Sequence, residues 1–491
     1  MTPSTSAQRE RDVVAGVPTG LLVGGEWRPS SSAEVLDVTD PATGLVLARV
    51  ADATVDDARE SIRIAAETQV SWAATPPRER SEILRRVYEL MVERSEDLAL
   101  LMTLEMGKPL AESRAEVLYA ADYFRWFSEE AVRLTGSWRM SPDGQSRLLV
   151  MKQPVGPCLL VTPWNFPLAM GTRKLGPALA AGNTVIVKPA KQTPLSMLAL
   201  AALLIEAGLP EGVLSVLTTS NSSGVVAAIM SDPRLRKLSF TGSTEVGIAL
   251  AQQAAPGLLR TSLELGGNAP FIVFDDADLD LAVDEAMRAK LRNNGEACTA
   301  ANRFYVQSGV VDEFVARLTE RFGRLVTGRG VDEAVTLGPL IDQASVDKVS
   351  ELVAAALADG AVKAFEGGTP TGGTYYPATI LAHVPAGSRV VREEIFGPVA
   401  PIVTFETEEE VVSLANDSEF GLASYLFTTD LARAIRVSER LEVGMVGLNK
   451  GVLSNVAAPF GGIKSSGFGR EGGDEGIDEY TETKYVALSG N

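Results

Sequence analysis

Apolar residues recur at helical spacing between residues 78 and 134. Leu84, Val87, Met91 and Leu98 are separated by three, four and seven positions, and most of the positions between them are polar. Residues at these intervals fall on one face of a helix with 3.6 residues per turn. The pattern therefore predicts long helices that pack through one apolar face.

The pattern changes near residue 155. The short β-rich runs "VGPCLLVT", "TVIVKP", "GVLSVL" and "RKLSFTG" alternate with helical segments such as "SMLALAALLIEAG". Strands and helices in alternation predict a parallel sheet covered by helices on both faces. Ligands of such sheets bind beyond the carboxyl ends of the strands. The segments to consider for function are therefore 162–165, 188–191 and 241–243.

A second α/β stretch begins near "LELGGNAPFIVFDDADLD" and continues to about residue 455. Two other segments follow a different pattern. Residues 136–154 resemble a hairpin that turns at Asp143-Gly144, and the chain ends in a Gly-rich segment followed by a strand-like one. We therefore expect two α/β domains and a small β extension.

Composition and charge exclude several classes of function. The chain has 491 residues, of which 45% are hydrophobic and 22% charged, as expected for a globular protein of two or three domains. A formal net charge of −18 disfavours binding to nucleic acid or to an anionic membrane surface. The first twenty residues contain no apolar run of signal-peptide length and predict an irregular polar arm.

The counts of cysteine and histidine limit the chemistry further. Two cysteines cannot form a disulfide framework in a chain of this length, which favours a reducing cytoplasm. The single histidine, His383, excludes zinc sites that need two histidines, and it is best explained as a surface or packing residue. We expect no metal site, and a carboxylate or a lysine as any general base.

The two cysteines have different surroundings. Cys158 lies in the apolar run "GPCLLVT", where a buried thiol acts as a small hydrophobic group. Cys298 lies among small and polar residues in "NNGEACTAANR", which makes it a candidate nucleophile. Glu264 stands between two leucines in "LELGGNAP", and is either a paired structural group or an acid/base whose pKa is raised by desolvation.

Polar residues at the predicted strand ends allow two interpretations each. Asn165, between the prolines of "TPWNFP", either caps a turn or donates a hydrogen bond to an oxyanion. Lys188 and Lys191, in "VIVKPAKQTP", are either solvated surface residues or nucleotide contacts. The helix start in "FTGSTEVG" favours a phosphate. The GxGxxG at residues 467–472 neither follows a predicted strand nor opens an apolar helix, so it does not predict a dinucleotide site.

Taken together, seven motifs resemble the aldehyde dehydrogenase superfamily, in order along residues 20 to 486. They are "PWNFP", "VKPA", "FTGSTEVG", "LELGGNAP", "GEACTAANR", "EEIFGP" and "PFGGIKSSGFGREGG". The resemblance implies an α/β fold with a Rossmann-like cofactor domain, a second α/β catalytic domain and a small β extension for oligomerisation. The expected boundaries are 1–135 with 155–262 for cofactor binding, 263–455 for catalysis, and 136–154 with 470–491 for oligomerisation.

The resemblance also implies roles for individual residues. Cys298 is the expected nucleophile, Glu264 the general base, and Asn165 with the Cys298 backbone N–H the oxyanion hole. The thiolate adds to an aldehyde, hydride leaves to a nicotinamide, and water activated by Glu264 hydrolyses the thioester. The cofactor contacts expected from the family are Trp164, Lys188, Ser243, Glu394 and Phe396.

Within the superfamily, "TRK" at 172–174, "RNNGEAC" and "NKGVLSNVAAPFGG" are most similar to succinate-semialdehyde dehydrogenases. The similarity implies that Arg173, Arg292 and Ser454 hold the distal carboxylate of a small aldehyde, and guanidinium groups suit a carboxylate. The alternatives are ion pairs of these arginines with nearby acids, another ω-carboxy aldehyde such as glutarate semialdehyde, and a noncatalytic protein that keeps the fold.

Two positions depart from common family patterns. Lys191 stands where many NAD-preferring relatives carry glutamate, and its charge would attract a 2′-phosphate, so we expect NADP as the preferred cofactor, with NAD as the alternative. Ala300 replaces a second cysteine that forms a regulatory disulfide in some relatives, so we expect no such switch. The family also implies a homodimer or homotetramer.

Overall fold

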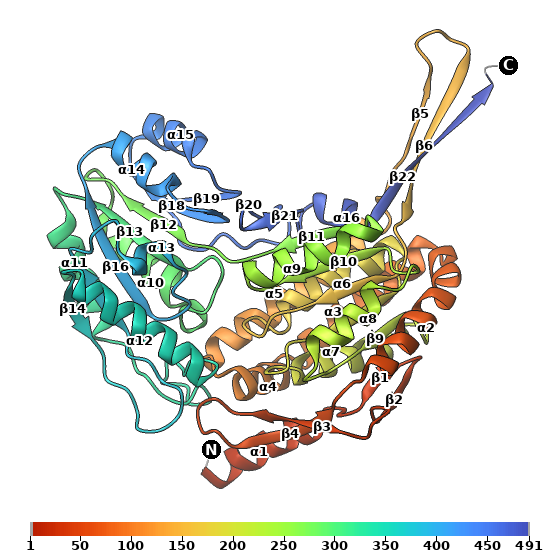
Figure 1. Cartoon of the computed structure of the whole chain (residues 1–491), viewed down its shortest axis with the longest axis horizontal. Helices are drawn as coiled ribbons and strands as arrows, with labels where there is room; N and C mark the ends of the chain where they lie inside the picture. Colours follow the sequence, from red (N-terminus) through yellow and green to blue (C-terminus); the bar gives the residue numbers. More distant parts are fainter. Residues whose placement is uncertain (1–2, 490–491) are drawn as a thin grey trace.

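The computed structural model, which describes residues 3–489, places two sheet-based bodies side by side, with a long antiparallel β extension projecting from one of them (Figure 1). The first body contains an eight-stranded sheet in the order β2-β1-β9-β8-β7-β10-β11-β21. The second contains a seven-stranded sheet in the order β14-β15-β16-β13-β12-β18-β19. The predicted α/β class is confirmed.

The central strands of the first sheet are the predicted β-rich runs. β7, β8, β9, β10 and β11 are parallel, and their pairing aligns Val161 with Lys188 and Thr241 with Glu264, so their carboxyl ends lie along one edge. The strand order reverses between β7 and β10, which is where a parallel sheet of this kind opens a crevice for a ligand. The strands are β1 (Leu21–Val23), β2 (Glu26–Arg28), β7 (Cys158–Val161), β8 (Val185–Lys188), β9 (Leu214–Val216), β10 (Lys237–Thr241), β11 (Arg260–Glu264) and β21 (Gly467–Phe468).

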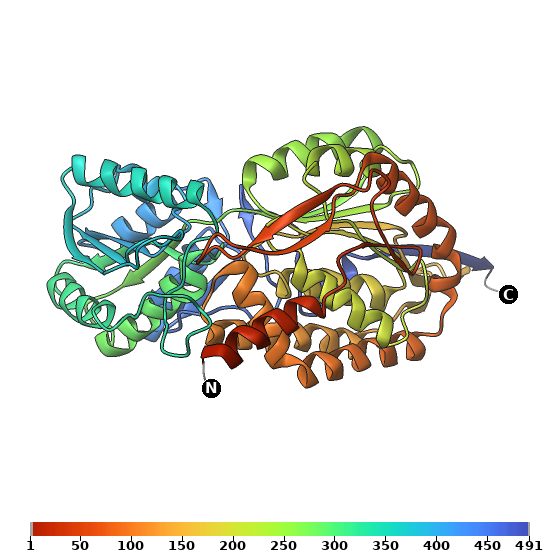
Figure 2. The same cartoon turned by 90° about the horizontal axis from the view of Figure 1, so that it is seen from below.

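Helices cover both faces of this sheet, as Figure 2 shows from below. In β7, Cys158 and Leu160 pack toward α3 to α7, whereas Leu159 and Val161 pack toward α2, α8 and α9. Because both faces are buried, the strands are apolar throughout rather than alternating. The helices are α2 (Val55–Ala74), α3 (Pro77–Glu93), α4 (Ser95–Met106), α5 (Leu110–Glu130), α6 (Ala169–Ala181), α7 (Leu195–Glu206), α8 (Ser222–Met230) and α9 (Thr244–Ala254).

The second sheet is parallel except for its edge strand β14. Phe271 and Val273 pack with α10 and α11 on one face, and Ile272 packs with α12 on the other. Its strands are β12 (Ala269–Val273), β13 (Ala301–Gln307), β14 (Val362–Glu366), β15 (Thr379–Ala382), β16 (Val399–Phe405), β18 (Ala423–Phe427) and β19 (Met445–Leu448). Its helices are α10 (Leu279–Leu291), α11 (Val311–Phe322), α12 (Gln343–Ala358), α13 (Arg389–Arg392), α14 (Glu408–Asn416) and α15 (Leu431–Arg440).

The predicted hairpin around Gly144 is confirmed. β5 (Ser137–Met140) pairs with β6 (Ser146–Pro154), and Gly144 takes the positive φ of 72° that the turn requires. The strand-like tail is β22 (Thr481–Ser489), which pairs along the full length of β6. The remaining strands are β3 (Val35–Thr39), β4 (Val46–Ala51), β17 (Phe420–Gly421) and β20 (Ile463–Lys464), and α16 (Glu475–Asp478) is a short helix before β22.

One expectation about the chain start is wrong. Instead of an irregular arm, Pro3–Ala15 forms helix α1, which Glu10 links to Arg329 by an ion pair of 2.9 Å. His383 is exposed and Cys158 is fully buried, as predicted. Among residues 3–489, no helix combines the length and the apolar composition needed to cross a membrane.

Candidate active site

Cys298 lies where two cavities meet. A cavity of about 550 Å³ extends between α5, α6 and the end of α10, and it is lined by Arg173, Arg292 and Ser454 among others. A second cavity, of about 270 Å³, lies at the carboxyl edge of the first sheet. Cys298 lines both of them. The thiol can therefore contact one ligand in each cavity at the same time.

The segment before Cys298 leaves the helix to present the thiol. α10 ends at Leu291, and a single 3₁₀ turn over Arg292–Gly295 follows it. Asn293 and Asn294 have φ of 57° and 59°, in the left-handed region that asparagine tolerates better than most residues. On the other side, the Tyr425 hydroxyl donates to the Thr299 carbonyl at 2.7 Å and fixes the chain after the nucleophile.

Asn165 and the backbone of Cys298 form a pair of donors. Asn165 is buried, and its Nδ2 donates to the Glu296 carbonyl at 2.9 Å, which uses one of its two hydrogens and fixes the amide. The Cys298 N–H has no protein acceptor in the part of the chain that the structure describes. Donors held in place before the reaction can stabilise an oxyanion that develops next to the sulfur.

The Cys298 thiol is protonated in this state. Enclosure by protein raises its pKa to about 12, and the charge of Arg173 is the main influence that opposes this rise. Glu394 and Glu264 raise the pKa further, and Arg292 lowers it. Only the thiolate is a strong nucleophile, so the thiol has to lose its proton when the substrate binds.

Glu264 ends β11 and is almost completely buried. Neither carboxylate oxygen has a hydrogen-bond partner within residues 3–489. Burial, followed by the neighbouring charge of Glu471, raises its pKa well above the usual range. The Glu264 side chain lines neither cavity. The segment that follows it packs closely against the nucleophile segment: a Cβ atom added to Gly267 would lie only 2.2 Å from the Cys298 carbonyl oxygen.

The ion-pair alternative for Arg173 is realised in part. Its Nε donates to Glu471, which also binds Lys174, while Nη1 and Nη2 are buried without any partner within residues 3–489. Although burial opposes it, the charges of Arg173 and Lys174 hold the pKa of Glu471 below its usual value. The Arg173 guanidinium also stands 4.0 Å from the centre of the Phe460 ring. Two of its nitrogens are thus left for a ligand.

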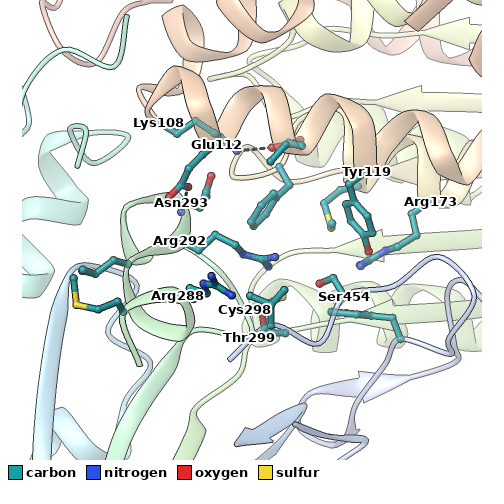
Figure 3. Close-up of a pocket in the computed structure, with 18 of the residues that line it drawn as sticks. Lys108, Glu112, Tyr119, Arg173, Arg288, Arg292, Asn293, Cys298, Thr299 and Ser454 are labelled. Carbon is teal, nitrogen blue, oxygen red and sulfur yellow. Dashed lines mark hydrogen bonds and ion pairs between the residues drawn. The ribbon is translucent and has the colours of Figure 1, made fainter. Parts of the chain in front are cut away.

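Arg292 has no ion pair or side-chain hydrogen bond with the described residues. Its guanidinium stands 5.2 Å from the centre of the Phe166 ring. Figure 3 shows the guanidinium groups of Arg173 and Arg292 pointing into the larger cavity from opposite sides, with Ser454 and Cys298 nearby. The structure therefore brings together the residues predicted to hold a carboxylate, in the cavity that contains the thiol.

The smaller cavity contains most of the predicted cofactor contacts. Trp164 and Phe396 meet edge to face, with ring centres 5.5 Å apart. Ser243 caps the start of α9, and Glu394 accepts a hydrogen bond from the Gly267 N–H at 3.0 Å. Burial raises the pKa of Glu394 to about 7. An apolar wall, a helix N-terminus and a carboxylate for hydroxyl groups suit a dinucleotide.

Lys188 and Lys191 are not brought into either cavity. Lys188 is the last residue of β8 rather than part of a loop, and it is buried without a hydrogen bond or ion pair among residues 3–489. Burial lowers its pKa to about 8. Lys191 is exposed three residues later.

The sequence interpretation missed several residues around the thiol. They share a place in the wall of the larger cavity or in the ion pairs behind it: Lys108, Glu112, Glu116, Tyr119, Phe166, Met170, Lys174, Phe460 and Glu471. One signal for these residues was available in the sequence. Glu112 and Glu116 are four residues apart, and so lie on the same side of a helix predicted to pack through an apolar face. Charged residues near such a face require buried partners.

Comparisons with known proteins agree with this geometry. Residues 27–486 match the model of the aldehyde dehydrogenase family. The succinate-semialdehyde dehydrogenase of Paenarthrobacter nicotinovorans is 56% identical, over 90% of this chain and 99% of that protein. The glutarate-semialdehyde dehydrogenase of Pseudomonas aeruginosa is 50% identical, over 95% and 97%. The crystal structure of an Escherichia coli NADP-dependent enzyme is 50% identical, with a TM-score of 0.95 over 96% of this chain and 98% of that one.

Proposed function

The chain belongs to the aldehyde dehydrogenase family, and we propose that it oxidises succinate semialdehyde to succinate with a nicotinamide dinucleotide as hydride acceptor. The observation that carries the substrate assignment is the pair of arginines with free guanidinium nitrogens in the cavity of Cys298. An aldehyde without a second polar group would leave these cations without a partner, whereas a distal carboxylate can accept from both. The similar proteins named for succinate semialdehyde support the same substrate.

The residues of the site act in sequence on the aldehyde carbon. The Cys298 thiol releases its proton to solvent and its sulfur adds to this carbon, and the Asn165 amide with the Cys298 N–H stabilises the oxyanion that forms. The nicotinamide, when bound, supplies the acceptor for the hydride that leaves the carbon. Glu264 then takes a proton from the water that attacks the thioester on Cys298, which releases the acid and restores the thiol.

Glutarate semialdehyde is the alternative substrate. It differs by one methylene, which changes binding by only about 1 to 3 kcal/mol in a pocket of this kind. The cavity of about 550 Å³ has room for either molecule. Because the chain is similar to a glutarate-semialdehyde dehydrogenase, kcat/KM should be measured for both semialdehydes.

The carboxylate assignment predicts a selective loss in the Arg292→Gln variant. Because Arg292 has no ion pair with any residue that the structure describes, the fold should be preserved while one charged hydrogen-bond partner of the substrate disappears. We expect kcat/KM for succinate semialdehyde to fall about 30- to 100-fold, mostly through KM, as for the loss of a charge-assisted hydrogen bond. Steady-state kinetics with butanal provide the internal control.

For butanal, which has no carboxylate, the same variant should change kcat/KM less than about threefold. Arg288→Gln serves as the charge-matched control, because this arginine also lines the cavity but is exposed and ion-paired with Glu285 at 2.9 Å. Equal losses for the charged and the uncharged aldehyde in Arg292→Gln would show that the arginine does not recognise the carboxylate.

We propose NADP⁺ as the preferred cofactor. Lys191 is exposed after β8, and its charge lies near Lys188, whose pKa it lowers. The exposed Lys191, just beyond this strand, would attract the 2′-phosphate that distinguishes NADP⁺ from NAD⁺. The similarity to an NADP-dependent Escherichia coli enzyme supports this preference.

Lys191→Glu should reverse the cofactor preference. A negative charge at this exposed position repels the 2′-phosphate, so kcat/KM for NADP⁺ should fall about 10- to 100-fold. NAD⁺ lacks that phosphate, and its kcat/KM should change less than about threefold. A parallel loss for both cofactors, measured at one ionic strength, would contradict a contact with the 2′-phosphate.

We further propose that 1–135 with 155–262 form the cofactor domain, 263–455 the catalytic domain, and 136–154 with 470–491 an oligomerisation extension. The extension exposes Trp138 and Tyr485, large apolar groups that an interface would bury in a homodimer or homotetramer. A reducing cytoplasm suits a protein that needs the free thiol of Cys298.

A further inference from the structure

A buried ion pair lies behind the segment that carries Asn165. Lys108 follows α4 and is fully buried, and its Nζ contacts the Glu116 carboxylate at 2.5 Å. The same ammonium group donates to the backbone carbonyl of Asn165 at 2.8 Å and stands 4.4 Å from the centre of the Phe166 ring. One cation therefore holds both the backbone and the following side chain of the oxyanion segment.

Glu116 holds the other end of this segment. Its second carboxylate oxygen accepts hydrogen bonds of 3.1 Å from the N–H groups of Leu168 and Ala169, at the start of α6. Leu168 offers no capping side chain of its own, so this carboxylate replaces the missing cap. The segment from Asn165 to Ala169 is thus clamped at both ends by a single ion pair.

Glu112, one helical turn before Glu116, contacts the opposite side of the site. Its carboxylate accepts from the N–H of Asn293, in the strained turn before the nucleophile. Asn293 Nδ2 donates to the Glu296 carbonyl at 2.9 Å, and Asn165 Nδ2 donates to that same oxygen at 2.9 Å. The Asn165 segment and the segment before Cys298 therefore share the Glu296 carbonyl as a hydrogen-bond acceptor. Both segments also bind glutamates of α5.

Stability does not explain this arrangement. An ion pair taken out of water is often no more stabilising than apolar side chains of the same volume, because both charges lose hydration. Lys108, Glu112 and Glu116 also line the cavity for a negatively charged substrate, where acidic side chains are unfavourable unless their charge is compensated. Their hydrogen bonds, in contrast, define where the Asn165 amide lies relative to Cys298.

We propose that Lys108 and Glu116, together with Glu112, are positioning residues that set the geometry of the oxyanion hole by clamping the Asn165 segment to the nucleophile segment. The inference rests on the proposed role of Asn165 as an oxyanion donor. None of the three residues needs to touch the reacting atoms for this role.

The test is a small series of variants that separates positioning from stability. Lys108→Met removes the bond to Asn165 and leaves the Glu116 charge without its ion-pair partner, so both kcat and Tm should fall. Lys108→Met with Glu116→Gln removes both charges, so Tm should recover toward the wild type. The kcat of this double variant should nevertheless stay about 10- to 100-fold low, because a displacement of the amide by about 1 Å has an effect of this size.

The KM for succinate semialdehyde should change less than about threefold in the double variant, because the arginines that hold the carboxylate are not altered. Glu116→Gln alone leaves the buried Lys108 charge without its ion-pair partner, so its Tm should fall as in Lys108→Met. Lys237→Met is the matched control: this lysine is also fully buried and paired with a glutamate, but it lies at the amino end of β10, away from both cavities. It should lower Tm without lowering kcat.

A double variant that regains both Tm and kcat would overturn the inference and leave the pair a purely structural role. Asn165→Ala separates this outcome from failure of the proposed function. If that substitution alone leaves kcat intact, Asn165 is not an oxyanion donor. If it lowers kcat and its effect adds fully to that of the double variant, Asn165 is a donor but the pair does not act through it. We expect kcat of the variant that combines all three substitutions to be close to kcat of Asn165→Ala alone.

Discussion

Replacing Cys298 with alanine is expected to lower kcat at least about 10⁴-fold with every aldehyde substrate, because no covalent intermediate can form without the sulfur. No other titratable group lines both cavities in the part of the chain that the structure describes, so none can take over the attack. The assay follows the appearance of the reduced cofactor with saturating succinate semialdehyde. Binding of the aldehyde should persist, since the arginines are unchanged.

Cys158→Ala is the matched control for this substitution. Cys158 is the only other cysteine, and it is fully buried in β7, where its thiol contacts the Gly156 carbonyl at 3.1 Å. Burial raises its pKa to about 12. The variant should retain kcat within about twofold and lose only a little stability. Alkylation with iodoacetamide, followed by mass spectrometry, should label Cys298, which is reached through both cavities, and leave the fully buried Cys158 unmodified. Activity that survives Cys298→Ala would exclude the thiol mechanism.

The strands and most helices could be predicted because their residues are constrained locally. β7 is apolar at every position because helices bury both of its faces, and the alternation of such runs with helical segments defines the parallel sheet. Helix α1 escaped prediction for the opposite reason. Its sequence is mostly polar and has no extended apolar face, and it is held by contacts with residues far along the chain: ion pairs of Arg9 with Asp97 and of Glu10 with Arg329, and packing of Val13 and Val14 on the first core. Such contacts leave no periodic signal.

The same distinction applies to the active site. Cys298, Asn165 and Arg173 stand in motifs whose resemblance to a family indicated their roles, and the structure brings them around connected cavities. Lys108 lies outside the seven motifs, and Glu471 lies in the last of them but was given no role there. Their roles depend on partners 57 and 298 residues away, at the Asn165 carbonyl and the Arg173 guanidinium. Sequence can therefore suggest the reacting groups more readily than the groups that position them.

Glu264→Gln should divide the reaction into a fast first half and a blocked second half. Formation of the thioester does not require the carboxylate as a base for water, so one equivalent of reduced cofactor per active site should appear in a burst. Hydrolysis then lacks its general base, and the steady-state kcat should fall about 10³-fold, within the range for loss of a positioned base. Rapid-mixing absorbance measurements detect the burst and the slow phase in one trace.

The pH dependence provides a second readout of the same group. Burial and the charge of Glu471 raise the pKa of Glu264, so its basic form is present only above that raised value and is lost as the pH falls. In the wild type, the rate of hydrolysis should therefore increase as the pH rises through this raised pKa, and Glu264→Gln should abolish this dependence. Glu296→Gln is the matched control, since Glu296 is equally buried and its pKa is also raised well above the usual range by burial, but its Oε1 accepts a hydrogen bond of 3.0 Å from the Ile341 N–H. Loss of the pH dependence in both variants would show that it arises from the buried surroundings rather than from Glu264 as the base.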